Sequence, residues 1–243
     1  MTAPVFIAEP DRLVRDHVVL DGAEGRHAAT VRRLRPGERV DLTDGAGLMA
    51  ECVVTASGRD TLELDVLARH RGAAPDPRIV VVQALPKGDR GELAVEIMTE
   101  VGVDEIVPWA AARCVTRWRP ERREKSLARW RTTAREAGKQ ARRAWLPGVP
   151  DLVTTEQVAD RIAAAAGAVV LHEAAATPLS SLELPAGGEI LLVVGPEGGL
   201  TDEEVATLTA AGGRPARLGP TVLRTSTAGA AAAAVLLSRT GRW

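Results

Sequence analysis

Uninterrupted apolar runs begin at Arg78 and limit the possible folds more than any other feature of the sequence. The segment RIVVVQAL (78–85) is a continuous apolar run, typical of a strand that is buried on both faces of a parallel sheet. A polar loop, a helical pattern that stops at Gly102 and a second strand-like segment, DEIVPW (104–109), follow it. This order predicts a β-α-β unit. The same alternation continues to the C-terminus and predicts an α/β domain.

The first 72 residues show a different pattern. Short segments with apolar-polar alternation, such as DHVVLDG (16–22) and DTLELDVLAR (60–69), are bounded by Gly, Asp and Ser. Between two of them, GRHAATVRRLRPGE (25–38) predicts a short basic helix. We therefore expect a small β-barrel with one basic edge at residues 1–72, and a second domain at residues 73–243 that begins in a Pro- and Gly-containing linker.

The composition argues against a membrane protein, a disulfide-stabilised secreted protein and a zinc protein. No apolar run approaches the roughly 20 residues that a membrane-spanning helix needs, and the N-terminus lacks a signal-peptide pattern. Cys52 and Cys114 are the only cysteines, and the four histidines show no metal-ligand spacing. We expect a cytoplasmic protein with no membrane partner and no bound metal.

Positive charge is concentrated between Arg113 and Arg143. This block holds twelve Lys or Arg against three Glu, a net charge of +9 in a chain whose net charge is −1. A solvated helix face is the simplest explanation of a charge run. Here, however, the acids are too few to balance the bases by i,i+4 pairing, and four of the five tryptophans lie in or beside the block. These features favour a nucleic-acid partner.

A glycine-rich turn lies within EILLVVGPEGGLTDEE (189–204). A phosphate-binding P-loop would need Lys and then Ser or Thr after its last glycine, but Leu200 and Thr201 follow Gly199, and the dinucleotide-binding spacing is also absent. Thr201 with Glu204 predicts a capping box at the start of a helix whose first turn carries three carboxylates. Because these carboxylates would repel a phosphate, the turn suits a ligand with little negative charge.

Two other loops are expected beside this turn. Ligands of open parallel sheets bind at the carboxyl ends of the strands, so the loops after AVVLHEA (168–174), EILLVV (189–194) and ARLGP (216–220) should form one pocket. The residues Thr225 to Thr227 can cap a final, alanine-rich helix. Either helix propensity or the close approach of another backbone, including a dimer seam, explains the alanines.

Four separated segments together resemble one family. LLVVGPEGGLTDEE (191–204) followed by RLGPTVLRTSTAGAAAAAVLL (217–237) resembles the C-terminal motifs of the SPOUT methyltransferases. GRHAATVRRLRPGERVDLTDGAG (25–47) is similar to the PUA-like barrel signature of one branch, the RsmE family. QALPKGDRGELAVEIMTEVGVDEIVPWAAARCV (83–115) and EAGKQARRAWLP (136–147) are similar to the start of its catalytic domain and to its central helix.

The resemblance implies a fold, a reaction and a cofactor. RsmE proteins methylate N3 of a uridine in 16S ribosomal RNA of the small ribosomal subunit, and they are homodimers. They join an N-terminal PUA-like β-barrel to a SPOUT α/β domain with a C-terminal trefoil knot. Their cofactor, S-adenosylmethionine, carries a sulfonium cation and no phosphate, which agrees with the acidic helix start. The residues that would hold it here are Leu171, Gly195, Pro196, Glu197, Gly198, Gly199, Leu218, Gly219, Leu223, Arg224, Thr225, Ser226, Thr227 and Ala228.

Several basic residues are candidates for roles in catalysis and RNA binding. Uracil N3–H is a weakly acidic imide, so methyl transfer needs positioning and loss of the N3 proton, and an arginine could stabilise the uridinate anion. Arg224 is the first candidate, with a structural ion pair as its alternative role; Arg113 and Arg143 are weaker ones. The residues expected to bind RNA are Arg26, Arg32, Arg33, Arg35, Lys87, Arg90, Arg113, Gln140 and Arg143.

Two departures from the family pattern leave alternatives open. Ser226 stands where the family commonly has an acidic residue, and QARR (140–143) replaces a more usual Gln-Ser-Gly-Arg pattern. The chain could be another SPOUT methyltransferase, acting on a ribose 2′-OH or on tRNA, or a non-catalytic RNA-binding or ribosome-assembly protein. The intact glycine turn argues against loss of activity, and the PUA-like signature argues against the ribose branch.

Overall fold

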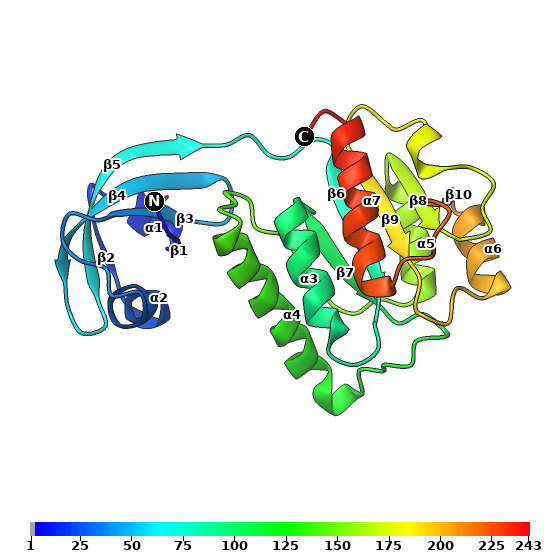
Figure 1. The fold of residues 1–243 in the computed structure, drawn as a ribbon, viewed down its shortest axis with the longest axis horizontal. Coiled ribbons are helices and arrows are strands. Elements are labelled where there is room, and N and C mark those ends of the chain that lie inside the picture. Colours follow the sequence, from blue (N-terminus) through cyan, green and yellow to red (C-terminus); the bar gives the residue numbers. More distant parts are fainter. Residues whose placement is uncertain (1–2) are drawn as a thin grey trace. The chain divides into compact units, whose positions relative to one another are not determined.

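The computed structural model describes residues 3–243 and divides them into two compact units, each described here by itself (Figure 1). The first unit contains the chain up to Ala74 together with Gly138–Leu146, and the second contains Pro75–Ala137 and Pro147–Trp243. The boundaries expected from the sequence, 1–72 and 73–243, differ from this division chiefly by the segment Gly138–Leu146. Its backbone is hydrogen-bonded to a turn of the first unit, from Gly47 N to Ala144 O (2.9 Å) and from Leu146 N to Gly45 O (3.0 Å).

A curled sheet of five strands forms the first unit. Its order is β1-β3-β4-β5-β2; β1 and β3 are parallel and the other pairs are antiparallel. The strands predicted from alternation are confirmed, whereas β1 had no sequence prediction. The alternating apolar residues point to one core that includes Leu42, Leu62 and Leu64. The bounds are β1 (Val5–Ile7), β2 (His17–Leu20), β3 (Arg39–Thr43), β4 (Leu48–Ser57) and β5 (Leu62–Arg71), with a short helix α1 (Pro10–Leu13).

The predicted basic helix starts earlier in the chain than expected. It consists of α2 (Gly22–Arg26) and a π-helical turn η1 (His27–Val31). Gly25 is required where this helix passes the end of β2 and the turn before β5, because a Cβ there would lie 2.5 Å from the carbonyl oxygens of Leu20 and Asp60. No side-chain rearrangement could relieve a contact with backbone atoms.

The end of helix α4 (Pro120–Gln140) contributes a buried ion pair to the first unit. Lys139 Nζ lies 3.0 Å from Glu24 Oε1 and 5.7 Å from the centre of the Phe6 ring, and only 3% of the lysine side chain is exposed. Glu24 also accepts a hydrogen bond from Ile7 N at 3.3 Å. Although Lys139 belongs to the basic block of the sequence, its charge is therefore used inside the protein rather than at the surface.

The second unit is built on a sheet of five parallel strands in the order β10-β8-β9-β6-β7. This confirms the expected α/β architecture, and Gly102 ends the first helix in the left-handed conformation (φ 113°) as predicted. The expected trefoil knot stays a prediction. The bounds are β6 (Arg78–Ala84), α3 (Arg90–Val101), β7 (Glu105–Trp109), α5 (Thr155–Ala164), β8 (Gly167–Leu171), η2 (Leu179–Ser181), β9 (Glu189–Val194), α6 (Asp202–Ala210), β10 (Arg214–Ala216) and α7 (Thr225–Arg239).

The alanine-rich helix α7 packs closely against α3 and against strands β6 and β9 (Figure 1). Ala230, Ala232 and Ala233 are buried. At Gly229 a Cβ would come within 2.8 Å of Met98 Sδ, so a larger residue would push the helices apart. Small side chains in this helix therefore permit tight packing within the chain itself.

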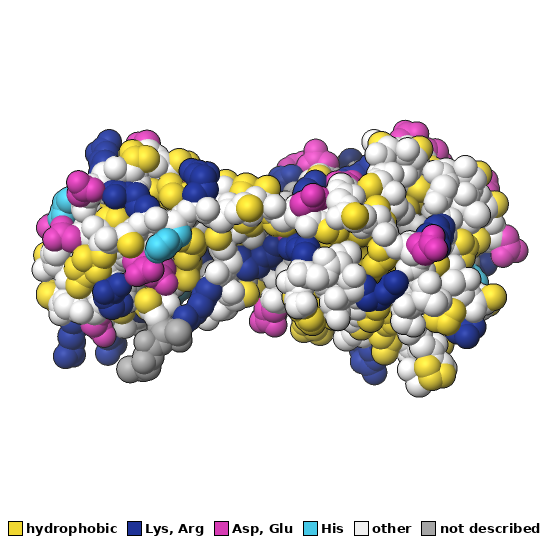
Figure 2. All heavy atoms as spheres, turned by 90° about the horizontal axis from the view of Figure 1, so that it is seen from above, with side chains coloured by type: hydrophobic (Ala, Val, Ile, Leu, Met, Phe, Trp, Pro, Cys, Tyr) yellow, Lys and Arg dark blue, Asp and Glu magenta, His cyan; other side chains and the backbone are white. Residues whose placement is uncertain are grey.

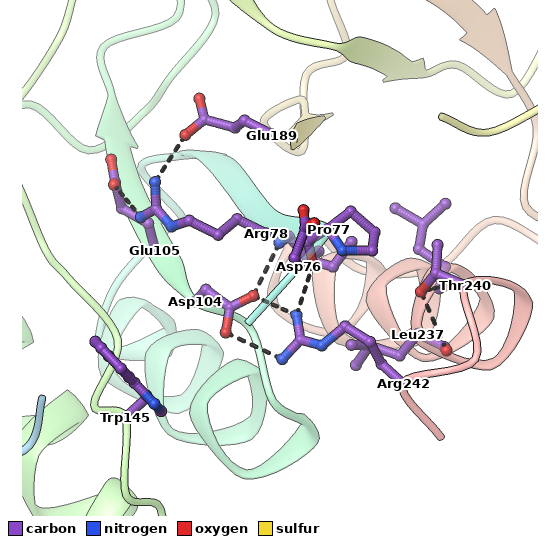
Figure 3. A network of polar contacts seen from close by, with 12 residues as sticks. Asp76, Pro77, Arg78, Asp104, Glu105, Trp145, Glu189, Leu237, Thr240 and Arg242 are labelled. Atoms are coloured by element: carbon purple, nitrogen blue, oxygen red, sulfur yellow. Dashed lines mark hydrogen bonds and ion pairs between the residues drawn. The ribbon is translucent and has the colours of Figure 1, made fainter. Parts of the chain in front are cut away.

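Ion pairs stabilise the amino ends of strands β6, β7 and β9. Arg242 is paired with Asp104 (Figure 3). Asp104 also accepts a hydrogen bond from Ile79 N at 2.9 Å. Nearby, Glu105 accepts hydrogen bonds from Arg78 (2.8 Å) and Arg161 (2.6 Å). Burial opposes ionisation of Glu105, but its two guanidinium partners prevail and hold its pKa below the ordinary value. The strands are thus fixed at this end, and their opposite ends carry the loops of the site.

Both cysteines are buried free thiols, and we expect them to resist alkylation in the folded protein. Burial raises the pKa of Cys52 to about 12 and also raises the pKa of Cys114. Because the thiolate is the reactive species, iodoacetamide at pH 8 should modify neither residue while the protein is folded, and both in urea. Mass spectrometry of tryptic peptides checks this, and rapid labelling of Cys52 without urea would contradict it.

No helix within residues 3–243 is long and apolar enough to cross a membrane. Nor do His, Cys, Asp or Glu side chains gather in threes there in a way that could hold a metal ion.

Candidate functional site

A pocket of about 430 Å³ lies at the carboxyl ends of three neighbouring strands in the second unit. Its walls come from the loops after β8, β9 and β10 and from the start of α7, the loops that the sequence predicted to meet. Its size is in the range of small-molecule sites. Of the residues proposed to hold a cofactor, it brings together Leu171, Gly195, Pro196, Glu197, Gly199, Leu218, Gly219, Leu223, Arg224, Thr225 and Ala228.

The glycine turn after β9 is held in shape by Arg113. Its Nη1 donates hydrogen bonds to Gly198 O (3.2 Å) and Leu200 O (3.0 Å). A Cβ at Gly198 would lie 3.1 Å from Arg113 Cβ, so the arginine occupies the space that a larger side chain would need. Gly199 has φ 72°, a conformation that favours glycine. Arg113, expected to bind RNA or to act in catalysis, thus supports the turn.

The predicted capping box at the start of α6 is confirmed. Thr201 Oγ1 accepts from Glu204 N (3.1 Å), and Glu204 Oε2 accepts from Thr201 N (2.9 Å). Glu204 is buried, and its other oxygen accepts from Ala112 N at 2.8 Å. Only the two remaining carboxylates of this turn are exposed, so the repulsion predicted for a phosphate comes from fewer charges than the sequence suggested.

Carboxylates also line the pocket itself. Glu173 and Glu197 belong to its wall, and Glu197 Oε1 accepts from Lys87 N at 3.1 Å. Of the pocket's two arginines, Arg217 donates to the carbonyls of Ala175 (3.2 Å) and Ala176 (2.9 Å) and so fixes the loop after β8. The pocket therefore offers backbone groups, carboxylates and one exposed guanidinium, that of Arg224.

Helix α7 does not begin with a side-chain cap, contrary to the expectation for Thr225 to Thr227. Its N-cap residue is Arg224, with no side-chain capping bond. Thr227 Oγ1 instead donates to Arg224 O at 3.2 Å. Thr225 and Ser226 are buried in the first turn, and neither Ser226 nor Thr227 lines the pocket.

Several residues of the wall were not predicted from the sequence. They lie within the segments that were singled out, next to the residues assigned to the cofactor, so membership of these segments was the available signal. They are His172, Glu173, Val194, Leu200, Arg217, Pro220, Thr221 and Val222.

The remaining candidates for RNA binding are distributed over both units. Arg26, Arg32, Arg33 and Arg35 are all exposed on the first unit, where Lys and Arg side chains lie among acidic ones in Figure 2. In the second unit, Lys87 is exposed and Arg90 is half-buried. Gln140 lies in the segment Gly138–Leu146 of the first unit and is exposed. Arg143 Nε donates to Trp145 O at 2.9 Å, so part of its guanidinium has a structural use.

Comparison with models of protein families shows to which family this chain is related. Residues 74–237 match the model of an RNA methyltransferase domain, and residues 20–67 match that of an RNA methyltransferase PUA domain. A ribosomal RNA small subunit methyltransferase E of Mycobacterium tuberculosis is 48% identical over 229 residues, 93% of this chain and 87% of the relative. The chain belongs to the RsmE family.

Other members of the RsmE family support the assignment. The Bacillus subtilis enzyme of the same name is 31% identical over 86% of this chain and 85% of its own. A crystal structure of ribosomal RNA small subunit methyltransferase E from Neisseria gonorrhoeae, bound to S-adenosyl methionine, has a TM-score of 0.87, 28% identity and 98% coverage of both chains. A methyltransferase from Legionella pneumophila with bound cofactor SAM has the same TM-score and coverage, at 26% identity. The combination of a PUA-like unit and a methyltransferase domain, expected from the resemblance, is confirmed.

Proposed function

We propose that this protein transfers a methyl group from S-adenosylmethionine to N3 of a specific uridine in 16S ribosomal RNA of the small ribosomal subunit. The pocket at the carboxyl ends of β8, β9 and β10 carries this proposal, because it joins the segments by which the chain resembles the RsmE family. The names of its relatives support the substrate class, and the cofactor bound in two related structures supports the methyl donor.

The chemistry of the pocket fits this cofactor. Glu173 and Glu197 suit a ligand with a positive charge and disfavour one with phosphates. The narrow turn that Arg113 supports offers backbone N–H and C=O groups, the kind of partners that an adenine ring and an amino acid moiety require. Leu171, Leu218 and Leu223 give the wall its apolar part.

The residues of the chain position the base and help to remove its proton. The cofactor supplies an electrophilic methyl group. Arg224 lines the pocket with an exposed guanidinium, and we assign it to the uridinate anion that forms when N3 loses its proton. Since N3 lies on the Watson–Crick edge, the target uridine is unpaired or flipped out when it reacts.

Both units supply RNA affinity in this proposal. The exposed Arg26, Arg32, Arg33 and Arg35 of the first unit provide phosphate contacts. Gln140 of the same unit and Lys87 and Arg90 of the second unit contribute further contacts. The proposal also includes that the protein is a homodimer and acts in the cytoplasm. The dimer is supported by Val222 and Leu223, apolar residues at the edge of the pocket that are 81% and 39% exposed.

Labelling of ribosomal RNA tests the function. The protein is incubated with labelled S-adenosylmethionine and small subunits from a bacterial strain that lacks uridine-N3 methylation, and the RNA is digested to nucleosides. We expect labelled N3-methyluridine. A labelled ribose 2′-O-methyl nucleoside, or label in tRNA alone, would instead assign the chain to another branch of methyltransferases. Absence of both label and cofactor binding would favour a non-catalytic RNA-binding protein.

A further inference from the structure

A second cavity, of about 520 Å³, lies in the second unit and has no part in the methyl transfer described above. It is bounded by the loop after β6, the first turn of α3, the segment before α4 and the first half of α4. Two tryptophans, Trp118 and Trp130, and four arginines, Arg117, Arg119, Arg122 and Arg129, belong to its lining. Aromatic rings next to guanidinium groups are the combination that binds unpaired nucleotides.

The tryptophans form a fixed wall. Their rings meet edge to face, with centroids 5.2 Å apart and an interplanar angle of 86°. Trp130 is buried against α3, where a Cβ at Gly91 would lie 2.8 Å from its Nε1. Trp118 stays partly exposed and lines the cavity. One indole is thus anchored in the core and holds the other at the edge of the cavity.

The arginines leave an excess of positive charge at the cavity. Arg129 is paired with Glu92 at 2.9 Å, and Asp89 is the only other acid of the lining. Within residues 3–243, no ion pair engages Arg117, Arg119 or Arg122, and all three side chains are exposed. Three guanidinium groups are therefore available to an anionic ligand.

One loop connects this cavity with the pocket of the proposed cofactor. Leu85, Pro86 and Gly88 line the cavity, while Lys87 N donates to Glu197 Oε1 in the wall of the pocket (3.1 Å). Thr116 Oγ1 donates to Pro86 O at 2.7 Å and holds the loop to the segment that carries Arg117 and Trp118. A chain of nucleotides that reached the pocket could therefore enter the cavity across this loop.

We propose that the cavity binds one nucleotide next to the methylated uridine, in an unpaired strand of the RNA substrate. Its base packs on Trp118, and the adjoining phosphates contact Arg117, Arg119 and Arg122. This inference rests on the proposed function, since it assigns a place to the RNA that flanks the target. An acidic peptide would use the arginines but would gain little from the indole, whereas a nucleotide uses both.

Two double variants of the full-length protein, with matched charge, test the proposal. Arg119→Gln/Arg122→Gln removes two charges from the cavity, and Arg123→Gln/Lys125→Gln removes two exposed charges of α4 that do not line it. The probe is a fluorescent single-stranded RNA oligonucleotide, and its Kd is measured by anisotropy at several salt concentrations. We expect the first variant to raise Kd about tenfold or more and to flatten the plot of log Kd against log salt by about 1.4, for two lost contacts. The second should change Kd less than about threefold.

The variant Trp118→Phe tests whether the base of the nucleotide packs on the indole of Trp118. The oligonucleotide should quench the intrinsic fluorescence of the parent protein, and the variant should lose most of this quenching. An equal loss of affinity in both double variants would overturn the proposal, because charge alone would then explain binding. Unchanged quenching in Trp118→Phe, or displacement of the RNA by polyglutamate at equal charge concentration, would overturn it as well.

The proposed function can fail separately from this inference. S-adenosylmethionine affinity, measured by calorimetry, should be the same in the parent and in both double variants, since neither pair lines the cofactor pocket. If the parent protein binds RNA through the cavity but forms no labelled N3-methyluridine, the proposed reaction is wrong and the cavity assignment stands. If the parent labels the uridine and Arg119→Gln/Arg122→Gln does so with unchanged KM, the cavity assignment is wrong.

Discussion

Replacing Arg224 with glutamine is expected to lower kcat for RNA methylation about 100-fold to 1,000-fold, the usual cost of removing one group that stabilises a transition-state anion. Arg224 lines the pocket at the carboxyl ends of β8, β9 and β10 and is exposed. The structural use of this residue lies in its backbone, because Arg224 O accepts hydrogen bonds from Thr227 N and Ala228 N, both at 2.9 Å. A side-chain substitution should therefore leave the start of α7 intact.

Kinetics can separate this role from a structural one. The Kd for S-adenosylmethionine should rise far less than kcat falls, because Arg224 is only one of several residues proposed to hold the cofactor, and Arg224→Lys, which keeps the charge, should recover part of kcat. The difference in methylation rate between the parent and Arg224→Gln should also shrink as the pH rises, because alkali removes the N3 proton without help from the arginine. Single-turnover rates across a pH series measure this. A kcat equal to that of the parent, or a deficit independent of pH, would assign the uridinate to another residue.

Replacing Lys139 with methionine is expected to cost about 3 kcal/mol of unfolding free energy in the first unit, because it leaves the partly buried carboxylate of Glu24 without its lysine. The lysine side chain is 3% exposed and that of Glu24 is 12% exposed, so water cannot easily replace the lost partner. Lys125→Met on the exposed part of the same helix is the matched control and should change stability by about 0.5 kcal/mol or less.

Hydrogen exchange locates the effect. Peptides that contain β1 and α2 should exchange faster in Lys139→Met, while peptides from β6 and β9 in the second unit should be unchanged. The double variant Glu24→Gln/Lys139→Met should lose less stability than the sum of the single variants, as expected for residues in contact. Equal protection of β1 in Lys139→Met and the parent would show that the ion pair contributes little.

The local pattern of the sequence predicted the elements well. The apolar run at Arg78, the glycine at position 102 and the capping box at Thr201 each depend on residues within one element or its ends, and each was confirmed. Strand β1 was missed because its three residues are too few to show an alternation. The segment Gly138–Leu146 was assigned by its position in the chain, whereas its hydrogen bonds join it to residues near Gly47.

The candidate site was predictable in outline. Parallel strands bring their carboxyl ends to one edge of a sheet, so three loops could be assigned to one pocket from their order alone. The role of single side chains could not be assigned in this way. Gly198 and Ser226 belong to recognised motifs, yet neither lines the pocket: one lies against Arg113 and the other is buried within α7.

By itself, the sequence determined the α/β class, the position of the loops that line the pocket and the resemblance to one family, since these depend on periodicity and on motifs in a fixed order. Tertiary structure alone decided which charges remain free. Arg113 and Lys139 carry the same charge as their neighbours in the basic block, but their partners, Gly198 and Glu24, lie 85 and 115 residues away in the chain. A composition count treats all these charges alike, whereas folding pairs Lys139 with a carboxylate, binds Arg113 to backbone carbonyls and leaves Arg117, Arg119 and Arg122 beside an open cavity.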